Sequence, residues 1–320
     1  MKTIIVGQIF KPLRLDKYLR NEIKSISREK IVSLIKKEKI KIKGKKRIKP
    51  STLLKGGEEI SLDISELKDS KDSFVLKPQS IYPEPEILYE DENLMVFDKP
   101  AGIIVHPSPD NLNNPSIVSW LIGKYSFLSQ VGEDKLRPGI VHRLDKETSG
   151  VLVVAKNNFS FNYLKNLFKT RQIKKKYIAL VKGEIKNQKG EIDLPLTRSK
   201  RSPTKRKVVT SYFQTTKAKT ALTRYKVIKR YQGFTLLEVF PETGRTHQIR
   251  VHLASIGFPI VGDKIYGKSK KKEIINLSRQ FLHAQEISFI SPTGESLEIK
   301  SSLPKELEEV LKSLKPSSVQ

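Results

Sequence analysis

The sequence contains no cysteine, and it has only two methionines and one tryptophan among its 320 residues. The absence of cysteine excludes disulfides, thiolate nucleophiles and cysteine-ligated zinc or iron–sulfur clusters. Any chemistry therefore uses oxygen and nitrogen groups. No apolar run approaches the roughly 20 residues that span a bilayer. The short apolar stretch from Thr3 to Phe10 is followed at once by charged residues and shows no small-residue cleavage site, so we expect a cytoplasmic protein.

Acidic residues are scarce as well. The chain has 34 aspartates and glutamates against 61 lysines and arginines, which gives a formal net charge of +27. Such a field attracts polyanions, and nucleic acid is the first candidate partner, ahead of a membrane surface. The length suffices for roughly two domains, the larger of which could bury a full apolar core.

The N-terminal region has a pattern of its own. Residues 14–19 open an amphipathic helix, and Ser27 is a suitable N-cap for a second helix in which Ile31, Leu34 and Ile35 repeat. Residues 39–44 then alternate with period two, which predicts a strand with isoleucines on its buried face. The sequence therefore predicts two short helices followed by a strand.

The outer face of this predicted strand carries Lys41 and Lys43 within a strongly basic segment. We interpret this face as a binding surface for RNA phosphates, and the alternative is a solvated, self-repelling loop. Residues 14–62 resemble the alpha-L RNA-binding motif of a ribosomal small-subunit protein. Lys39 and Lys43 stand where that motif usually has a glycine and an asparagine, and both changes keep or add positive charge.

Residues 66–86 lose periodicity and have the composition of a linker. We therefore predict an RNA-binding domain at residues 1–65 and a larger domain at residues 87–315. In the larger domain a helix is predicted over residues 161–168 with Ser160 as its N-cap. Strand-like runs recur at residues 94–97, 151–155, 177–181, 222–228 and 234–240. The expected fold class is α+β, with a small α/β RNA-binding domain and a larger, mainly antiparallel-sheet domain with peripheral helices.

The densest polar cluster is Arg137–Gly150, which reads R-P-G-I-V-H-R-L-D-K-E-T-S-G and precedes the apolar run Val151–Ala155. A polar loop at the end of a sheet projects side chains into a cleft, which favours a functional role. A structural explanation is equally open for any one residue, because Asp, Thr, Ser and Gly also form turns through local hydrogen bonds.

This cluster is similar to the central motif of the RluA family of pseudouridine synthases. Segments 98–107, 175–181, 243–250 and 262–267 agree with that family in order and character, so the resemblance covers nearly the whole chain. It implies an isomerase that converts uridine to pseudouridine in structured RNA, most commonly large-subunit ribosomal RNA. The reaction needs no redox change, which fits a sequence without a Gly-rich nucleotide loop or metal-ligand spacing. We expect no cofactor and no metal, and a monomer.

The resemblance also implies roles for individual residues. Asp145, the aspartate of the His-Arg-Leu-Asp segment, is the expected catalytic carboxylate. Tyr177 is expected to stack on the target uracil and to assist proton removal, and Arg245 is expected to pair with Asp145 and keep it ionised. Arg143 is expected to aid extrusion of the target base, with a phosphate contact as the alternative.

The neighbours of these residues receive smaller roles. For His142 the expected task is hydrogen bonding within the loop that faces the RNA. For Arg250, as for His247 and Gln248, we expect helix packing and contacts to the RNA backbone rather than chemistry. The basic residues of 198–207 are expected to grip RNA backbone, although a solvated surface loop would explain them nearly as well.

Three other functions compete with an isomerase. A non-catalytic RNA-binding or ribosome-associated factor would explain the charge and the N-terminal pattern, but not the intact central motif. An RNA methyltransferase would need a cofactor loop that is missing. A hydrolytic glycosidase would need two opposed carboxyl groups, whereas Asp145 and Glu147 lie two positions apart on one loop.

Overall fold

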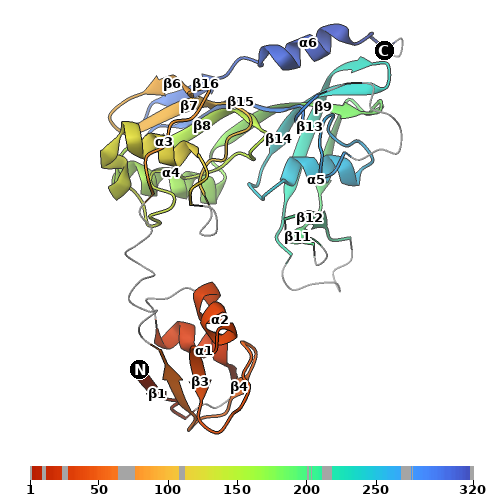
Figure 1. Ribbon diagram of the computed structural model, residues 1–320. Coiled ribbons are helices and arrows are strands. Elements are labelled where there is room, and N and C mark those ends of the chain that lie inside the picture. The colour runs from red at the N-terminus through yellow and green to blue at the C-terminus, as the bar shows by residue number, and fades with distance from the viewer. Residues whose placement is uncertain are drawn as a thin grey trace. The chain divides into compact units, whose positions relative to one another are not determined.

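The computed structural model describes residues 2–8, 12–23, 28–63, 76–107, 112–199, 202, 204–210, 218–267, 275 and 277–317. The chain divides into two compact units, Met1–Val75 and Leu76–Gln320 (Figure 1). The first half of the predicted linker, residues 66–75, lies outside the described residues. Its second half belongs to the larger unit, because Leu76 and Ile81 are buried in that unit's core. The boundary of the larger unit therefore precedes residue 87.

The first unit combines a small sheet with two helices. The strands β1, β5 and β3 pair antiparallel in that order. Ile40 and Ile42 of β3 are buried and Lys41 between them is exposed, which confirms the predicted alternation. Ser27, the predicted helix cap, lies outside the described residues. The elements of this unit are β1 Lys2–Ile5, β2 Leu13–Arg14, α1 Leu15–Glu22, α2 Arg28–Lys36, β3 Ile40–Ile42, β4 Leu53–Leu54 and β5 Glu59–Leu62.

The second unit is built on a nine-stranded sheet. Its main path runs β10-β13-β14-β9-β15-β8-β7-β6, and β16 pairs with β15. The strands are β6 Glu86–Glu90, β7 Leu94–Lys99, β8 Ser149–Ala155, β9 Lys174–Lys182, β10 Lys189–Asp193, β13 Leu222–Tyr231, β14 Phe234–Pro241, β15 Leu282–Ile290 and β16 Ser296–Lys300. A separate hairpin consists of β11 Leu196–Arg198 and β12 Arg206–Val208. Each strand predicted from the sequence is present, and the α+β class is confirmed.

The parallel contact in this sheet is short and lies at its centre. β8 and β15 pair parallel through Ser149 with His283 and Gly150 with Ala284, whereas the other strand pairs are antiparallel. Apolar side chains form one core around β6, β7 and β8 and a second core around β9, β13 and β14. The junction between β8 and β15 therefore joins two lobes, and loops that meet there can form a pocket.

The helices of the second unit cover the two lobes. In Figure 1, α3 (Ile117–Lys124) and α4 (Asn158–Thr170) lie below the lobe of β6–β8. There α5 (Gln248–Ser255) lies below the other lobe, while α6 (Lys305–Ser313) runs above the sheet. A short 3-10 helix spans Ser126–Gln130. None of the helices in the described part of the chain is long and apolar enough to cross a membrane.

The predicted cap of α4 is wrong by three residues. Asn157 is the N-cap, and its side-chain oxygen accepts a 2.8 Å hydrogen bond from the backbone N–H of Ser160. Ser160 lies inside the first turn, where it is buried and its hydroxyl donates to the backbone oxygen of Asn93. Both residue types are good caps, and the strand that ends at Ala155 sets which of them starts the helix.

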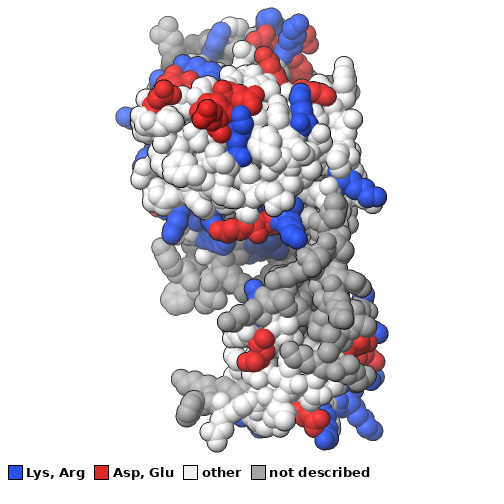
Figure 2. Space-filling model, turned by 90° about the vertical axis from the view of Figure 1, so that its left-hand side faces the viewer, with Lys and Arg blue, Asp and Glu red and all other residues white. Residues whose placement is uncertain are grey.

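Charge is not spread evenly over the surface. Figure 2 shows one face on which acidic and basic side chains lie side by side over the second unit, with wide uncharged areas between them. Cationic side chains also gather in the lining of the pocket described next.

Candidate active site

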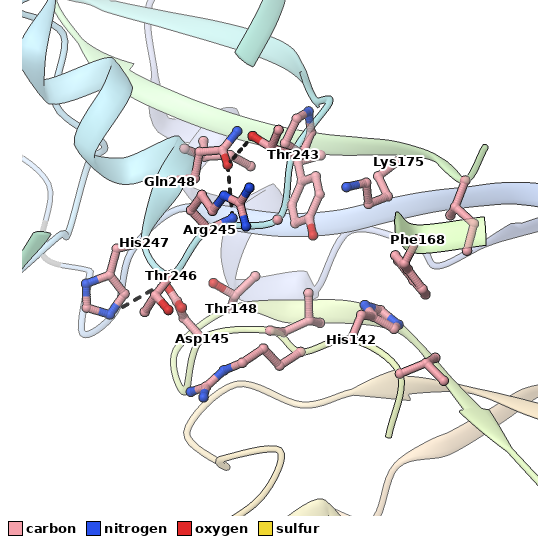
Figure 3. A pocket seen from close by; sticks show the side chains of 18 of the residues that line it. His142, Asp145, Thr148, Phe168, Lys175, Thr243, Arg245, Thr246, His247 and Gln248 are labelled. Carbon is pink, nitrogen blue, oxygen red and sulfur yellow. Dashed lines mark hydrogen bonds and ion pairs between the residues drawn. The ribbon is translucent and has the colours of Figure 1, made fainter. Parts of the chain in front are cut away.

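A pocket of about 480 Å³ opens where the two lobes of the second unit meet (Figure 3). Most of its lining comes from four segments: the loop before β8, the last turns of α4, the start of β9, and the turn that leads into α5. The cationic residues of the lining are Arg137, Arg143, Lys165, Lys169, Arg171, Lys175, Arg245 and Arg250. A cavity with this lining suits a polyanion with a flat polar group at its centre.

Asp145 lies on the loop that precedes β8. The turn is closed by a 3.1 Å hydrogen bond from the N–H of Thr148 to the backbone oxygen of Asp145. Gly150 follows with a φ of 112°, and a Cβ there would collide with the backbone oxygen of Ala284. The glycine therefore lets β8 approach β15 closely, and this approach fixes the position of the loop. The side chain of Asp145 is 16% exposed and faces the pocket.

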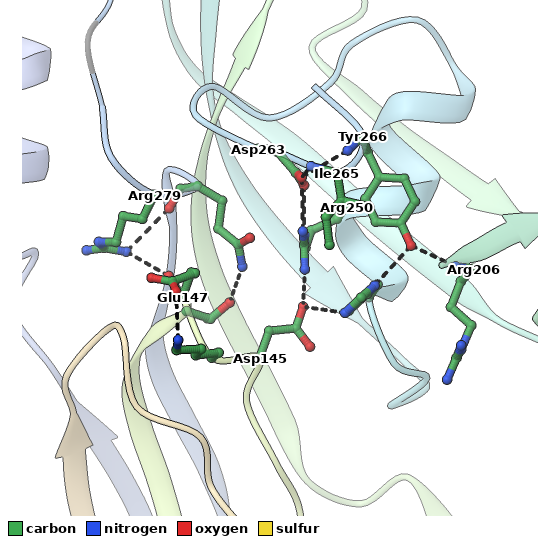
Figure 4. Close-up of polar contacts among 12 residues, drawn as sticks. Asp145, Glu147, Arg206, Arg250, Asp263, Ile265, Tyr266 and Arg279 are labelled. Atoms are coloured by element: carbon green, nitrogen blue, oxygen red, sulfur yellow. Dashed lines mark hydrogen bonds and ion pairs between the residues drawn. The ribbon is translucent and has the colours of Figure 1, made fainter. Parts of the chain in front are cut away.

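The ion-pair partner of Asp145 is Arg250, so the predicted pairing with Arg245 is wrong. Nη1 of Arg250 donates to Oδ2 of Asp145 over 3.0 Å. Nε and Nη2 of the same guanidinium donate to the two carboxylate oxygens of Asp263 over 2.7 and 2.9 Å (Figure 4). Arg250 is 5% exposed, so its contacts lie inside the protein, and the expected contact with the RNA backbone stays a prediction.

Arg245 lies one turn ahead of this pair. Its backbone N–H donates to the side-chain oxygen of Gln248, and its Nε donates to the backbone oxygen of Thr220 over 3.1 Å. Because α5 begins at Gln248, Arg250 projects from the helix toward Asp145, whereas Arg245 stays in the preceding turn. Arg245 still lines the pocket, from a different wall.

Burial and charge act in opposite directions on Arg250. Burial alone would lower the pKa of its guanidinium, but hydrogen bonds to Asp263 and the charges of Asp263 and Asp145 raise that pKa above its ordinary value. The pKa of Asp263 is lowered, because the bonds and charge of Arg250 outweigh the effect of burial. Both groups of this buried pair are therefore ionised at neutral pH.

Tyr177 and Lys175 lie two residues apart on β9 and both line the pocket. Burial, together with the charge of Asp145, raises the pKa of the Tyr177 phenol above its ordinary value, so it is protonated at neutral pH. Burial lowers the pKa of Lys175 to about 8. Within the described residues the side chain of Lys175 has no hydrogen bond or ion pair, which leaves its ammonium free to meet a bound molecule.

His142 and Arg143 lie close to Asp145 in the sequence but make different contacts. Nε2 of His142 accepts a 2.9 Å hydrogen bond from the N–H of Val153, and its ring stacks on Phe168 with centroids 4.8 Å apart. Burial lowers the pKa of His142 to about 3, so the ring is neutral. Arg143 is exposed, and its Nη1 donates to Nε2 of His106 over 3.2 Å. His142 therefore supports the loop, and Arg143 is free to reach a ligand.

Lys41 and Lys43 belong to the first unit and do not line the pocket. Both are exposed on or next to β3, and Nζ of Lys43 pairs with Glu59 over 2.7 Å. Of the basic cluster at 198–207, residues 200, 201 and 203 lie outside the described residues. The flanks of that cluster form the β11–β12 hairpin.

Sequence reasoning missed a buried lysine that contacts the loop of Asp145. Lys99 is fully buried, and its Nζ donates to the backbone oxygens of Pro100, Ile103 and Lys146 over 2.6, 2.9 and 3.2 Å. Burial lowers the pKa of Lys99 to about 7, against the charge of Glu147. Lys146 follows Asp145 directly, so this hydrogen bond of Lys99 fixes the backbone of the loop next to Asp145.

Arg279 holds the same loop from its other side. Its Nη1 donates to the backbone oxygen of Glu147 and its Nη2 to the hydroxyl of Ser149, each over 3.2 Å (Figure 4). Gln280 donates to the hydroxyl of Thr148 over 2.8 Å. A lysine and an arginine far from the loop in sequence carried no local signal of this role. In the described part of the chain no group of three or more His, Asp or Glu side chains could hold a metal ion.

Comparisons with known proteins point in one direction. A family model described as RNA pseudouridylate synthase matches residues 93–255. The chain is 42% identical over 287 residues to an uncharacterized RNA pseudouridine synthase of Aquifex aeolicus, covering 88% of this chain and 86% of that protein. It is 35% identical over 308 residues to ribosomal large subunit pseudouridine synthase D of Zymomonas mobilis, covering 94% and 93% of the two chains.

Solved structures agree with this result. Human RNA pseudouridylate synthase domain containing 4 is 29% identical, with a TM-score of 0.55 over 72% of this chain and 94% of that one. Human RNA pseudouridylate synthase domain containing 1 is 23% identical with a TM-score of 0.56, which shows a shared fold.

Proposed function

The chain belongs to the RluA family of RNA pseudouridine synthases and is an RNA isomerase, and on this premise we propose that Asp145 is its catalytic carboxylate. The observation that carries the proposal is the 3.0 Å ion pair between Arg250 and Asp145 in a cation-lined pocket. A buried carboxylate must stay ionised to react, and a fixed guanidinium provides the counter-charge. Arg250 takes the role that the sequence assigned to Arg245.

The reaction requires a group that acts at the sugar or at the base. The bond from C1′ of the ribose to N1 of uracil breaks, the base rotates, and a bond from C1′ to C5 forms. The proton on C5 leaves and N1 gains one, so atoms balance without a cofactor. A carboxylate can act as a nucleophile or as a base in this sequence, and can stabilise positive charge at C1′. A closed pocket keeps the detached uracil in place.

Tyr177 is proposed as the platform on which the uracil stacks. Its ring lines the pocket, and Asp145 lies near enough for its charge to raise the pKa of the phenol. Aromatic stacking holds a flat base while leaving it free to turn in its plane. Because the phenol is protonated at neutral pH, stacking is the first role we assign to Tyr177, and proton removal from C5 comes second.

The target base must leave the RNA helix to reach Asp145, at a cost of a few kcal/mol. Arg143 is proposed to offset this cost, because it is exposed beside Asp145 and can occupy the space that the base vacates. The β11–β12 hairpin and the basic face of β3 are proposed to bind RNA phosphates. We assign residues 1–65 to an alpha-L RNA-binding domain and residues 87–315, with the packed segment before them, to catalysis.

Large-subunit ribosomal RNA is the proposed substrate, and the cytoplasm the proposed location. The support is the similarity to the enzyme of Zymomonas mobilis, which is named for the ribosomal large subunit and matches almost end to end. The basic character of both units fits a large folded RNA. Family membership selects the isomerase over the three competing functions raised by the sequence.

The decisive test is Asp145→Asn beside Glu147→Gln, which makes the same change of charge two residues along the loop. Asp145→Asn is expected to lower pseudouridine formation by about 10⁴-fold and to leave RNA affinity within about threefold. Glu147→Gln is expected to stay within about tenfold of the parent. Pseudouridine would be mapped in large-subunit ribosomal RNA from cells that lack the gene and carry each variant. Product from Asp145→Asn at the parent rate would overturn the proposal.

A further inference from the structure

The hydroxyl of Tyr266 lies between the β11–β12 hairpin and the catalytic pocket. Its oxygen accepts a 2.8 Å hydrogen bond from the backbone N–H of Arg206, the first residue of β12. The same oxygen lies 2.9 Å from Nδ1 of His247 (Figure 4). One phenol therefore contacts a backbone group of the hairpin and an imidazole of the site.

The bonding of Tyr266 sets the tautomer of His247. The phenol accepts from the N–H of Arg206, and within the described residues Nδ1 of His247 is the contact to which it can donate its proton. We assign the phenol as the donor in the contact with His247, so that Nδ1 accepts its proton and the neutral ring carries its own proton on Nε2. Nε2 lies 4.0 Å from Oδ2 of Asp145, the oxygen that Arg250 also contacts. The N–H of the imidazole is thus directed at the proposed catalytic carboxylate.

The backbone of His247 supports a dedicated role. Its φ is 58°, a left-handed conformation that a residue with a side chain rarely adopts and that costs roughly 1 kcal/mol. His247 is the residue immediately before α5. The strained backbone therefore occurs at the residue whose ring lies next to both Tyr266 and Asp145.

Tyr266 comes from a loop that already serves Asp145. Asp263, three residues earlier, accepts hydrogen bonds from Arg250. Its Oδ1 also accepts from the backbone N–H groups of Ile265 and Tyr266 over 2.8 and 3.0 Å. The guanidinium of Arg250 lies over the Tyr266 ring, 5.3 Å from its centroid. One rigid loop thus reaches Asp145 along two routes, through Arg250 and through His247.

We propose that Tyr266 and His247 form a hydrogen-bonded relay that positions the Asp145 carboxylate and couples it to the β11–β12 hairpin. This inference rests on the proposed role of Asp145. When the hairpin binds RNA, Arg206 and Tyr266 hold the imidazole in place and Nε2 closes onto Oδ2 of Asp145. Hydrogen bonds of catalytic sites are often long without substrate and shorten when it binds. Both residues are positioning residues, because they act through Asp145.

Tyr266→Phe tests the relay with the smallest change. It removes the hydroxyl and keeps the ring over Arg250. Tyr163→Phe is the matched control, because it removes a hydroxyl that donates to the backbone oxygen of Ile290 away from the pocket. Tyr266→Phe is expected to lower the single-turnover rate roughly tenfold to a hundredfold, with the Kd for RNA within about threefold. The control is expected to match the parent in both.

A double variant separates a relay from two independent contacts. His247→Gln alone is expected to lower the rate by a factor similar to that of Tyr266→Phe. Because both act on Asp145 along one path, Tyr266→Phe combined with His247→Gln is expected to be little slower than either alone. Rate losses that multiply would show that the two residues act separately, and would overturn the relay.

The tautomer supplies a readout that does not depend on turnover or on the yield of folded variant. The chain has five histidines, so the ring ¹⁵N signals of His247 can be assigned by substitution. The parent is expected to show protonated Nε2 and bare Nδ1, and Tyr266→Phe is expected to lose this preference. A parent ring with its proton on Nδ1 would contradict the relay.

The remaining outcomes assign each failure to one proposal. A Tyr266→Phe rate within twofold of the parent, with Asp145→Asn inactive, overturns the relay and leaves the catalytic assignment intact. An active Asp145→Asn overturns the assignment of Asp145. A Tyr266→Phe variant whose loss lies wholly in Kd would make Tyr266 a contact for RNA and would also overturn the relay.

Discussion

Nη1 of Arg250 lies 3.0 Å from Oδ2 of Asp145, and the other edge of the same guanidinium is bound by Asp263. One cation therefore stands between two carboxylates, and its plane is fixed by the two hydrogen bonds on the Asp263 side. This second carboxylate orients Arg250 so that its Nη1 donates to Asp145. The contacts of the carboxylate within the described part of the chain are made by Oδ2, which leaves Oδ1 open to a substrate.

The first prediction compares Arg250→Lys with Arg245→Lys. A lysine keeps the charge but cannot bind Asp263 in a bidentate manner and still reach Asp145. Arg250→Lys is therefore expected to lower the catalytic rate by roughly 10²-fold, and to lower the free energy of unfolding by about 2 to 4 kcal/mol. Single-turnover kinetics and thermal unfolding would measure the two effects.

Arg245→Lys provides the matched control for that variant. Its Nε donates to a backbone oxygen near the surface, which a lysine can also reach. The rate is expected to stay within about fivefold and the stability within about 0.5 kcal/mol of the parent. The reverse ranking, with Arg245→Lys the more damaging change, would restore the pairing suggested by the sequence.

The sequence alone could not show which of Arg245 and Arg250 pairs with Asp145. Both lie in the segment Thr243–Arg250, so the motif alone did not decide between them. The choice depends on where α5 begins and on Asp263, whose position next to Arg250 comes from tertiary packing. Strand positions were predictable, because an apolar run or a two-residue alternation is a local pattern.

Contacts between distant segments could not be read in the same way. Lys99 binds the backbone of Lys146, 47 residues away, and Arg279 binds that of Glu147, 132 residues away. The family resemblance marked the segments that hold Lys99 and Asp263, but gave them no task. Backbone carbonyls as acceptors leave no trace in a sequence, since every residue has one.

The second prediction concerns the ammonium of Lys175. Burial lowers its pKa to about 8, and it faces the pocket without a hydrogen bond or ion pair among the described residues. We expect the charged form to contact the bound RNA, so KM for RNA should rise as pH increases through about 8. Lys175→Met should raise KM several-fold to tenfold at pH 7 and remove this pH dependence.

The titration of Lys175 should also affect the free energy of unfolding, and here an increase in pH is favourable. The pKa of Lys175 in the folded protein lies below the value of 10.5 for an exposed lysine. Between about pH 8 and 10.5 the unfolded chain therefore binds more protons, and stability gained from this group rises with pH. Lys174→Met, which alters the exposed neighbour on β9, should leave both profiles unchanged. A KM that is flat between pH 7 and 9 in the parent would rule out the contact.

The third prediction addresses the basic face of the first unit. If its exposed lysines bind phosphates, each neutralised contact should reduce the slope of log K against log salt concentration by roughly 0.7 to 0.9. The test is a triple lysine-to-glutamine variant at Lys41 of β3 and at Lys45 and Lys46, which follow β3 in the same basic segment; all three are exposed. Its control makes the same change of charge at Lys305, Lys312 and Lys315, exposed in or just after α6.

The variant of the first unit should lose about 2 units of slope. It should keep the parent rate at saturating RNA, because its lysines do not line the pocket. Equal slopes for the two variants would mean that net charge alone attracts the RNA, and that the face of β3 has no specific role in binding.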